Sequence, residues 1–256
     1  MSRQVDYRKI IKAVVGKQIP KPLSGTLSGH AAGEPFDKLV YQAVKSIYPN
    51  NAYRQFEYLN SLFSKRSDMV DHESRNKLIG SPTLMYLLSR GKNATDNWSL
   101  EHPFEEKQND TADIIIVHDN HFELIDVKTR NLTKKSQPPN IISAYKLARL
   151  CALIIDNRDY ELLSIHYIEL GWRPIGDSLI CETGSHTELF KINPFDLYIN
   201  WAAAMQIQFH VSDIKPNFEK PTTDWPREYI RHFVEQARRR AEDMIVRFVH
   251  PFEKYL

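Results

Sequence analysis

The sequence predicts a single α/β domain that spans residues 1–256. Two short apolar runs joined by a tight turn within residues 114–127 indicate a β-hairpin, and helical periodicity recurs in residues 34–48 and 225–248. No internal repeat or low-complexity segment divides the chain, and 256 residues suffice for one large core. A mixed domain of helices and strands is therefore the simplest architecture.

The N-terminal part is predicted to be mainly helical. Residues up to about 23 are basic and end in Ile-Pro-Lys-Pro, which indicates a short helix and an extended linker. Residues 24–30 combine glycines with hydroxyl side chains, so they fit either a phosphate-binding loop or a plain connection. In residues 34–48 apolar side chains recur at helical spacing, with Glu34 opening the helix and Pro35 behind it. We expect Glu34 to serve either as a capping charge or in a supporting catalytic role.

The rest of the chain alternates strands and helices. The segment before residue 100 is expected to form helices and loops. After the hairpin, the expected elements are a polar loop at 131–140, a helix at 141–156, strands at 162–169, 179–182 and 206–211, and an amphipathic helix at 225–248. The arginines of the last helix lie off its apolar stripe, so that face is expected to contact solvent, DNA or a second subunit.

Composition narrows the class of protein. A net charge of +2 excludes a globally basic coat, so any contact with DNA must come from local clusters such as 128–135 and 238–240. Cys151 and Cys181 have no metal-ligand spacing, and no apolar run is long enough to cross a membrane. We expect a cytoplasmic protein with free thiols and no membrane role. His118 and His121, which flank the hairpin turn, are expected to be exposed.

The hairpin is predicted to bring three charged side chains together. Residues 114–117 and 122–127 are apolar runs separated by four polar residues, whose Asp-Asn centre suits a two-residue turn. That turn sets a register in which Asp113 lies opposite Asp126, with Cβ atoms roughly 5 Å apart. Lys128 lies two residues beyond Asp126 and so shares its face of the sheet.

These side chains suit metal-assisted phosphodiester cleavage. Opposed carboxylates destabilise a sheet unless a cation lies between them. Oxygen ligands without a nearby cysteine favour Mg²⁺ or Mn²⁺, so Asp113, Asp126 and the Val127 carbonyl are the predicted metal ligands. Asp113, Asp126 and Lys128 are the predicted catalytic residues, and Lys128 would orient or help to deprotonate the attacking water. An ordinary half-exposed hairpin is the alternative.

Longer blocks of sequence carry a resemblance to a known family. The acids and lysine of the hairpin, together with residues 24–36, 105–113, 126–131, 140–146 and 198–210, resemble type II restriction endonucleases of the PD-(D/E)XK nuclease superfamily. The similarity runs from about residue 23 to the C-terminus. It implies a mixed central β-sheet flanked by helices, and a homodimer that cuts double-stranded DNA at the centre of GTYRAC. Blunt ends with 5′-phosphates, Mg²⁺ that Mn²⁺ can replace, and no organic cofactor are also implied.

The resemblance also implies which residues contact DNA. It places Gln137 as a wedge in the base stack and Asn140 at the central purine in the major groove. The implied DNA-binding set is Gln108, Thr129, Arg130, Gln137, Pro138, Asn140, Tyr198, Asn200 and Ala202. Two positions depart from the family pattern. Ala112 replaces a proline that does no chemistry, and Pro138 stands after Gln137 where the family pattern predicts a smaller residue, which leaves the stiffness of this loop and the geometry of the wedge open. A repair or recombination nuclease that selects DNA structure, and a non-catalytic DNA-binding module, remain the alternatives.

Overall fold

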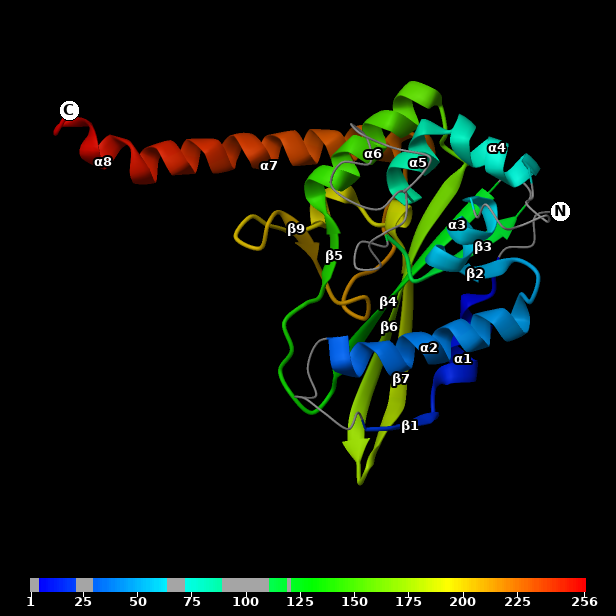
Figure 1. Ribbon diagram of the computed structural model, residues 1–256. Coiled ribbons are helices and arrows are strands. Elements are labelled where there is room, and N and C mark those ends of the chain that lie inside the picture. The colour runs from blue at the N-terminus through cyan, green and yellow to red at the C-terminus, as the bar shows by residue number, and fades with distance from the viewer. Residues whose placement is uncertain (1–4, 22–29, 64–71, 89–110, 119–120) are drawn as a thin grey trace.

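The computed structural model describes residues 5–21, 30–63, 72–88, 111–118 and 121–256 (Figure 1). The helices are α1 (Tyr7–Val14), α2 (His30–Ile47), α3 (Gln55–Phe63), α4 (His72–Gly80), α5 (Pro82–Leu88), α6 (Ala144–Asn157), α7 (Trp225–Phe248) and α8 (His250–Glu253), with short 3-10 turns η2 (Leu189–Lys191), η3 (Pro194–Asp196) and η4 (Thr222–Asp224). The strands are β1 (Gln18–Pro20), β2 (Ala52–Arg54), β3 (Ile114–His118), β4 (His121–Asn131), β5 (Asn140–Ser143), β6 (Leu163–Ile175), β7 (Ser178–Glu188), β8 (Ile199–Asn200) and β9 (Gln206–Gln208).

The larger sheet has the strand order β1-β7-β6-β4-β3-β2. The β4–β6 pair is parallel and the other neighbouring pairs are antiparallel, so the sheet is mixed. The first ten residues of β6 are buried without interruption, which requires cover on both faces of the sheet. The predicted mixed sheet flanked by helices is confirmed.

Helices cover the two faces of this sheet unequally. On one face, α1 and α2 contribute buried residues such as Ile10, Phe36, Val40 and Val44 to a compact cluster. The spacing of four residues in α2 places these side chains on one stripe of the helix. On the other face, α3 to α7 pack against the sheet in a larger cluster that includes Trp225. Asp113 directly precedes β3 and Asp126 lies in the middle of β4, two neighbouring strands held between these two layers.

A second, three-stranded antiparallel sheet has the order β5-β9-β8. It lies beside α6 and α7 (Figure 1). Its central strand β9 follows a tight turn in which Ala204 and Met205 have φ values of 52° and 56°. Residues other than glycine rarely adopt this left-handed backbone conformation, so contacts with neighbouring residues must hold the turn. One such contact is the hydrogen bond of 2.8 Å from the Ala144 N–H to the Met205 carbonyl.

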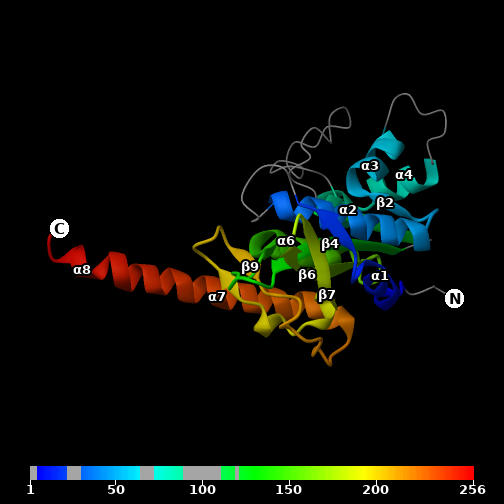
Figure 2. The same cartoon turned by 90° about the horizontal axis from the view of Figure 1, so that it is seen from below.

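The C-terminal helices leave the body of the molecule. Figures 1 and 2 both show α7 projecting away from the two sheets, with α8 at its far end. Trp225 and Tyr229 of the first turns are buried, whereas every residue from 238 to 256 is exposed. The long amphipathic helix predicted at 225–248 is confirmed with the same bounds. No helix in the described part of the chain is both long and apolar enough to cross a membrane.

Other predicted boundaries were wrong. The helix expected at 141–156 begins at Ala144, because Ile141 and Ile142 belong to β5 and the Ser143 side chain caps the helix by accepting the Lys146 N–H at 3.3 Å. The strands predicted at 162–169 and 179–182 extend to Ile175 and Glu188, and the one predicted at 206–211 ends at Gln208. Four further strands, β1, β2, β5 and β8, were not predicted as strands. Nearly all of the loop expected at 24–30 lies outside the described residues.

Candidate active site

The β3–β4 hairpin forms in the predicted register. Ile115 pairs with Leu124, and His118 pairs with His121. The turn residues 119–120 lie outside the described part of the chain. Because β2 and β6 flank this hairpin, its strands lie inside the sheet and their ends are fixed on both sides.

Asp113 contacts β4 through both its backbone and its side chain. The strand ladder ends one residue after it, and its N–H donates to the Ile125 carbonyl at 3.0 Å. Its Oδ2 accepts the Val127 N–H at 2.7 Å. The N–H and C=O of one strand residue point to the same side, so the Val127 carbonyl is directed past the end of β3 toward Asp113.

Asp126 and Lys128 meet Asp113 at this strand end. The Lys128 Nζ lies 2.7 Å from Asp126 Oδ2, and their side chains are 21% and 15% exposed. Burial, followed by the charge of Asp126, raises the pKa of Asp113 from 3.8 to about 7, although the Val127 N–H lowers it. Burial lowers the pKa of Lys128, but attraction to Asp126 and Asp113 outweighs burial, so this pKa lies above its usual value. The lysine is therefore protonated at neutral pH, while the two acids repel one another.

The donor set fits a hard divalent cation. It comprises the carboxylates of Asp113 and Asp126 and the carbonyl of Val127, all oxygen atoms. Within the described residues, no cluster of three or more His, Cys, Asp or Glu side chains is arranged to bind a metal. Mg²⁺ is commonly bound by one or two carboxylates together with water and substrate phosphate, so a larger acidic cluster is not required. Burial and, after it, the charge of Asp126 raise the pKa of Asp113, and a bound cation would favour the ionised carboxylate against both effects.

Two side chains that sequence reasoning missed hold the backbone before Asp113. Gln55, which is 1% exposed, accepts the N–H groups of Thr111 and Ala112 at 3.1 and 3.0 Å and donates to the Leu88 carbonyl at 3.0 Å. Arg54 donates to the Asp113 carbonyl at 3.4 Å. No local pattern marks either residue, because their partners lie 33 to 59 positions away in the chain.

Arg54 also binds a third acid beside the pair. Its Nη1 lies 2.5 Å from Asp37 Oδ1, and both side chains are about one-fifth exposed. Burial and the charge of Asp113 raise the pKa of Asp37, against the stabilising bond from Arg54. Asp37 therefore adds to the negative field at Asp113, while its own charge is largely neutralised by Arg54.

Comparison with known proteins identifies the family. The family model for restriction endonuclease HincII matches residues 10–256. The chain belongs to the HincII restriction endonuclease family. It is 55% identical over 250 residues to the type II restriction enzyme HindII of Haemophilus influenzae, across 98% of this chain and 97% of that protein. The type II restriction enzyme HincII of Haemophilus influenzae is 54% identical over the same shares.

The predicted resemblance and the predicted enzyme class are thereby confirmed. Among solved structures, the NlaIV restriction endonuclease aligns with 52% of this chain and 61% of its own, at 14% identity and a TM-score of 0.26. This likeness is too weak to support any argument. The assignment therefore depends on the family model and on the two close relatives.

Glu34 lies inside α2 and not at its start. α2 begins at His30, so the prediction that Glu34 opens this helix was wrong; the two alanines before Gly33 favour helix and extend it backward. The Glu34 carboxylate is 68% exposed and lies 2.7 Å from Lys38 Nζ. A Cβ added at Gly33 would lie 3.9 Å from Thr129 Oγ1, so the first turn of α2 is next to β4.

The predicted DNA-contact residues fall into two groups. Thr129 and Arg130 continue β4 beyond Lys128, and the Arg130 Nη1 binds Ser212 Oγ at 3.0 Å and Asp213 Oδ1 at 3.3 Å. The second group lies on the loop after β4 and on the second sheet. Its exposed members are Gln137, Pro138, Asn140, Tyr198 and Ala202, with Asn200 half-buried. Gln108 lies outside the described residues.

A buried hydrogen bond between Glu169 and His210 connects these regions. Glu169 of β6 is the register partner of Lys128, and its Oε1 lies 2.6 Å from the Nδ1 of buried His210. Its Oε2 accepts the N–H and the hydroxyl of Ser212, both at 3.1 Å. The His210 Nε2 lies 3.4 Å from the carbonyl of Ser136, immediately before the predicted wedge. Strand β6, which pairs with the strand that carries Lys128, is therefore connected through His210 to the predicted DNA-contact loop.

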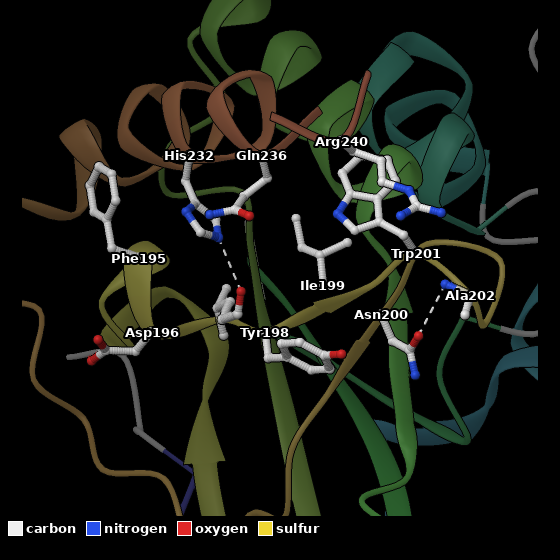
Figure 3. Close-up of a pocket in the computed structure, with 11 residues that line it drawn as sticks. Phe195, Asp196, Tyr198, Ile199, Asn200, Trp201, Ala202, His232, Gln236 and Arg240 are labelled. Atoms are coloured by element: carbon white, nitrogen blue, oxygen red, sulfur yellow. Dashed lines mark hydrogen bonds between the residues drawn. The ribbon is translucent and has the colours of Figure 1, made fainter. Parts of the chain in front are cut away.

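A pocket lies behind the predicted DNA-contact loop of the second sheet. It has a volume of about 510 Å³ and is bounded by residues 195–202 and by α7 (Figure 3). Asn200 and Trp201 form part of its wall, and the partly buried Trp201 packs against the core. Asp113 and Asp126 do not line it. The pocket thus separates this loop from α7 and is distinct from the strand end that carries the acids.

The two turn histidines are not exposed, contrary to prediction. His121 bonds through Nε2 to Ser164 Oγ at 2.9 Å and through Nδ1 to the Glu161 carbonyl at 2.7 Å. His118 Nε2 lies 3.4 Å from Glu123 Oε1. The prediction placed them beside an exposed turn, but His121 contacts Glu161 and Ser164, next to and within β6, and His118 contacts Glu123 of β4.

These histidines border a buried polar cluster under α1. The Tyr7 hydroxyl donates to Glu123 Oε2 at 2.6 Å, and its ring stacks on His186 with centroids 3.7 Å apart. His186 Nε2 lies 3.0 Å from His166 Nδ1. Burial lowers the pKa of His186 to about 4, and burial together with the charges of neighbouring histidines places the pKa of His166 well below its usual value. Both rings are therefore neutral at physiological pH.

Proposed function

We propose that this HincII-family chain hydrolyses duplex DNA at the palindrome GTYRAC with Mg²⁺, leaving blunt ends with 5′-phosphates. The observation that carries the proposal is the junction of Asp113, Asp126 and Lys128 at one strand end, in a chain that matches restriction enzymes over nearly its whole length. We further propose that residues 1–256 form one domain and that the enzyme acts in the cytoplasm.

Each residue of the junction has a definite task. Asp113, Asp126 and the Val127 carbonyl would bind Mg²⁺, which supplies charge neutralisation on the phosphate and a lower pKa for the attacking water. Lys128 is held by Asp126 Oδ2 at 2.7 Å and is protonated, so its Nζ can donate hydrogen bonds to the water or to a phosphate oxygen. Of the two predicted roles of the lysine, orientation and charge stabilisation fit the raised pKa better than proton abstraction.

Recognition would come from the second group of DNA-contact residues. By resemblance, Gln137 enters the base stack and Asn140 contacts the central purine, with Gln108, Thr129, Arg130, Pro138, Tyr198, Asn200 and Ala202 around them. Pyrimidine–purine steps unstack readily, which fits a wedge at the centre of GTYRAC. Glu34 would act only indirectly, because its carboxylate is exposed and paired with Lys38.

Plasmid cleavage tests the proposed function. The purified chain, incubated with plasmid in Mg²⁺ or in EDTA, should give discrete blunt fragments ending at GTYRAC in Mg²⁺ alone. Nicking at forks or mismatches would favour the repair nuclease, and DNA binding without cleavage would favour the binding module. Either result contradicts the proposal.

A lysine variant tests the mechanism. Lys128→Ala should lower cleavage by about 10²–10³-fold, the usual effect of losing one preorganised donor at a transition state. Binding to a GTYRAC duplex in Ca²⁺, measured by gel shift, should change little. Lys12→Ala, which removes an exposed lysine from α1, is the matched control. A Lys128→Ala protein as active as this control would refute the assignment.

We also propose that the chain is a homodimer that pairs through the projecting half of α7. Val234, Ala237, Ala241, Met244 and Phe248 follow steps of 3, 4, 3 and 4, which form an apolar seam typical of paired helices. Met244 is 48% and Phe248 53% exposed. Every residue of α7 from 238 to 248 is exposed in a single chain, and a palindrome calls for a two-fold symmetric reader, so a second copy is the partner we infer.

Sedimentation tests this interface. The double variant Met244→Glu/Phe248→Glu should be monomeric at micromolar concentration and should lose double-strand cleavage. Arg239→Glu, which changes a charge off the seam, should remain dimeric. A double variant that stays dimeric, or a wild-type chain that is monomeric with and without DNA, contradicts the proposal.

A further inference from the structure

Three amide side chains form a continuous hydrogen-bonded chain across the second sheet. We call Asn200, Gln208 and Asn140 the amide chain. Asn200 Nδ2 donates to Gln208 Oε1 at 2.9 Å, and Gln208 Nε2 donates to Asn140 Oδ1 at 2.7 Å. β9 lies between β5 and β8, and Asn140 is the register partner of Gln208, so the central strand connects the two outer ones. Sequence reasoning selected Asn140 and Asn200 but not the glutamine between them.

The direction of this chain is fixed at one end by the backbone. Asn200 Oδ1 accepts the N–H groups of Ala202 and Ala203 at 3.1 and 3.2 Å. A side-chain NH₂ group there would face two donors, so only the oxygen can occupy the position. The left-handed residues Ala204 and Met205 hold the turn that presents these N–H groups.

Each later amide must follow the first. Because Asn200 presents Nδ2 to Gln208, Gln208 must present Oε1 in return and turn its Nε2 toward Asn140. Asn140 must then present Oδ1 to Gln208. Its Nδ2 group is left as the donor that the amide chain does not use, and Asn140 is exposed.

We propose that Gln208 is a positioning residue that sets Asn140 as a hydrogen-bond donor toward the DNA base. The proposal rests on the proposed function, in which Asn140 contacts the central purine. Adenine and guanine both carry N7 as a major-groove acceptor, whereas their neighbouring groups are an amino donor and a carbonyl acceptor. A fixed donor on Asn140 matches N7 of either base, which accounts for tolerance of both purines at this position. An amide free to turn could instead bind adenine through both of its atoms.

Gln208→Glu should reverse the outer amide. A carboxylate at position 208 can still accept from Asn200, but its second oxygen cannot donate to Asn140. Asn140 would then turn its Nδ2 toward residue 208 and its Oδ1 toward the base. An outward acceptor suits the adenine amino group and repels the guanine carbonyl.

Two measurements test this proposal. In nitrogen–proton correlation spectra of the free protein, the Asn140 side-chain NH₂ signal should move downfield and exchange more slowly in Gln208→Glu than in wild type. In cleavage, the ratio of kcat/KM for GTTAAC to that for GTCGAC should rise at least tenfold. Gln206→Glu adds the same charge to the same strand outside the amide chain, and it should leave both the spectrum and the ratio unchanged.

The outcomes separate the two claims. An unchanged Asn140 signal in Gln208→Glu overturns the amide chain. A reversed amide with an unchanged cleavage ratio, or a ratio that changes equally in Gln206→Glu, overturns the role in specificity. If the wild-type enzyme cut neither hexamer, the proposed recognition sequence would fail, and the Asn140 signal would still decide the orientation.

Discussion

Replacing Gln55 by methionine should release the backbone of Thr111 and Ala112, just before Asp113, while keeping the volume of the side chain. The amide of Gln55 makes three hydrogen bonds, to Thr111, Ala112 and Leu88, in a position that is 1% exposed. Each buried backbone group left without a partner costs about 1–3 kcal/mol. Allowing for local rearrangement and for the apolar methionine, we expect a loss of about 3 kcal/mol, or a Tm roughly 6–12 °C lower for a chain of this length.

The variant separates this effect from a general loss of folding. Urea unfolding gives the free energy, and plasmid cleavage at a temperature where the variant remains folded gives the function. Because Thr111 and Ala112 lead directly into Asp113, cleavage should need more Mg²⁺ than in wild type. Gln42→Met, on the exposed side of α2, is the control and should change neither quantity. A Gln55→Met protein within about 1 kcal/mol of wild type that also cleaves normally would refute this reasoning.

Three further predictions follow from titratable groups. Burial lowers the pKa of His186 to about 4, so between about pH 6.5 and 4 the folded state binds fewer protons than the unfolded chain. The free energy of unfolding should therefore fall as pH falls through this range, by up to about 1 kcal/mol per pH unit. In urea unfolding, the dependence of this free energy on pH should be weaker in His186→Gln and unchanged in His250→Gln. Burial raises the pKa of Cys151 well above its usual value and that of Cys181 to about 11, so at pH 8 both thiols should react slowly with Ellman's reagent unless the protein is unfolded, and fast labelling of the native protein would contradict their burial. The pKa of Asp113 is raised to about 7, mainly by burial and then by the charge of Asp126, so its ionisation removes stability as pH rises from about 4 to 7. At pH 8 without metal, Asp113→Asn should unfold with a free energy about 2–4 kcal/mol higher than wild type, and it should lose cleavage. Calorimetry that shows no such gain in stability would contradict the cost of burying this charge.

The hairpin was predictable because its information is local. The side-chain period of two and a turn of two residues determine every pair from His118–His121 inward, and the structure has those pairs. The same holds for α7, where apolar spacing over 24 residues defines both ends of the helix. Both elements depend on residues that are close in sequence: the adjacent strand in the hairpin, and the neighbouring turns in α7.

The elements that were missed depend on distant partners. Ile141 and Ile142 have helical spacing with the residues that follow, but pairing of β5 with β9, more than 60 residues later, makes them a strand. Gln55 and Gln208 are single polar residues whose hydrogen bonds reach 56 and 68 positions along the chain. Nothing within a short window distinguishes such a glutamine from one exposed to solvent.

The acids were found for the opposite reason, because they break a local rule. Two facing carboxylates cost stability, and in the folded chain burial together with the charge of Asp126 raises the pKa of Asp113. Function explains why a sequence would retain it, since a cation and a phosphate would relieve the repulsion. The amide chain breaks no such rule, because each donor meets an acceptor. The direction of its hydrogen bonds follows only from the N–H groups of Ala202 and Ala203, which both donate to Asn200 Oδ1. The predicted catalytic groups are therefore visible in the sequence as a local conflict of charges, whereas the residues that we propose to orient the base contacts have satisfied hydrogen bonds and become visible only in the folded sheet.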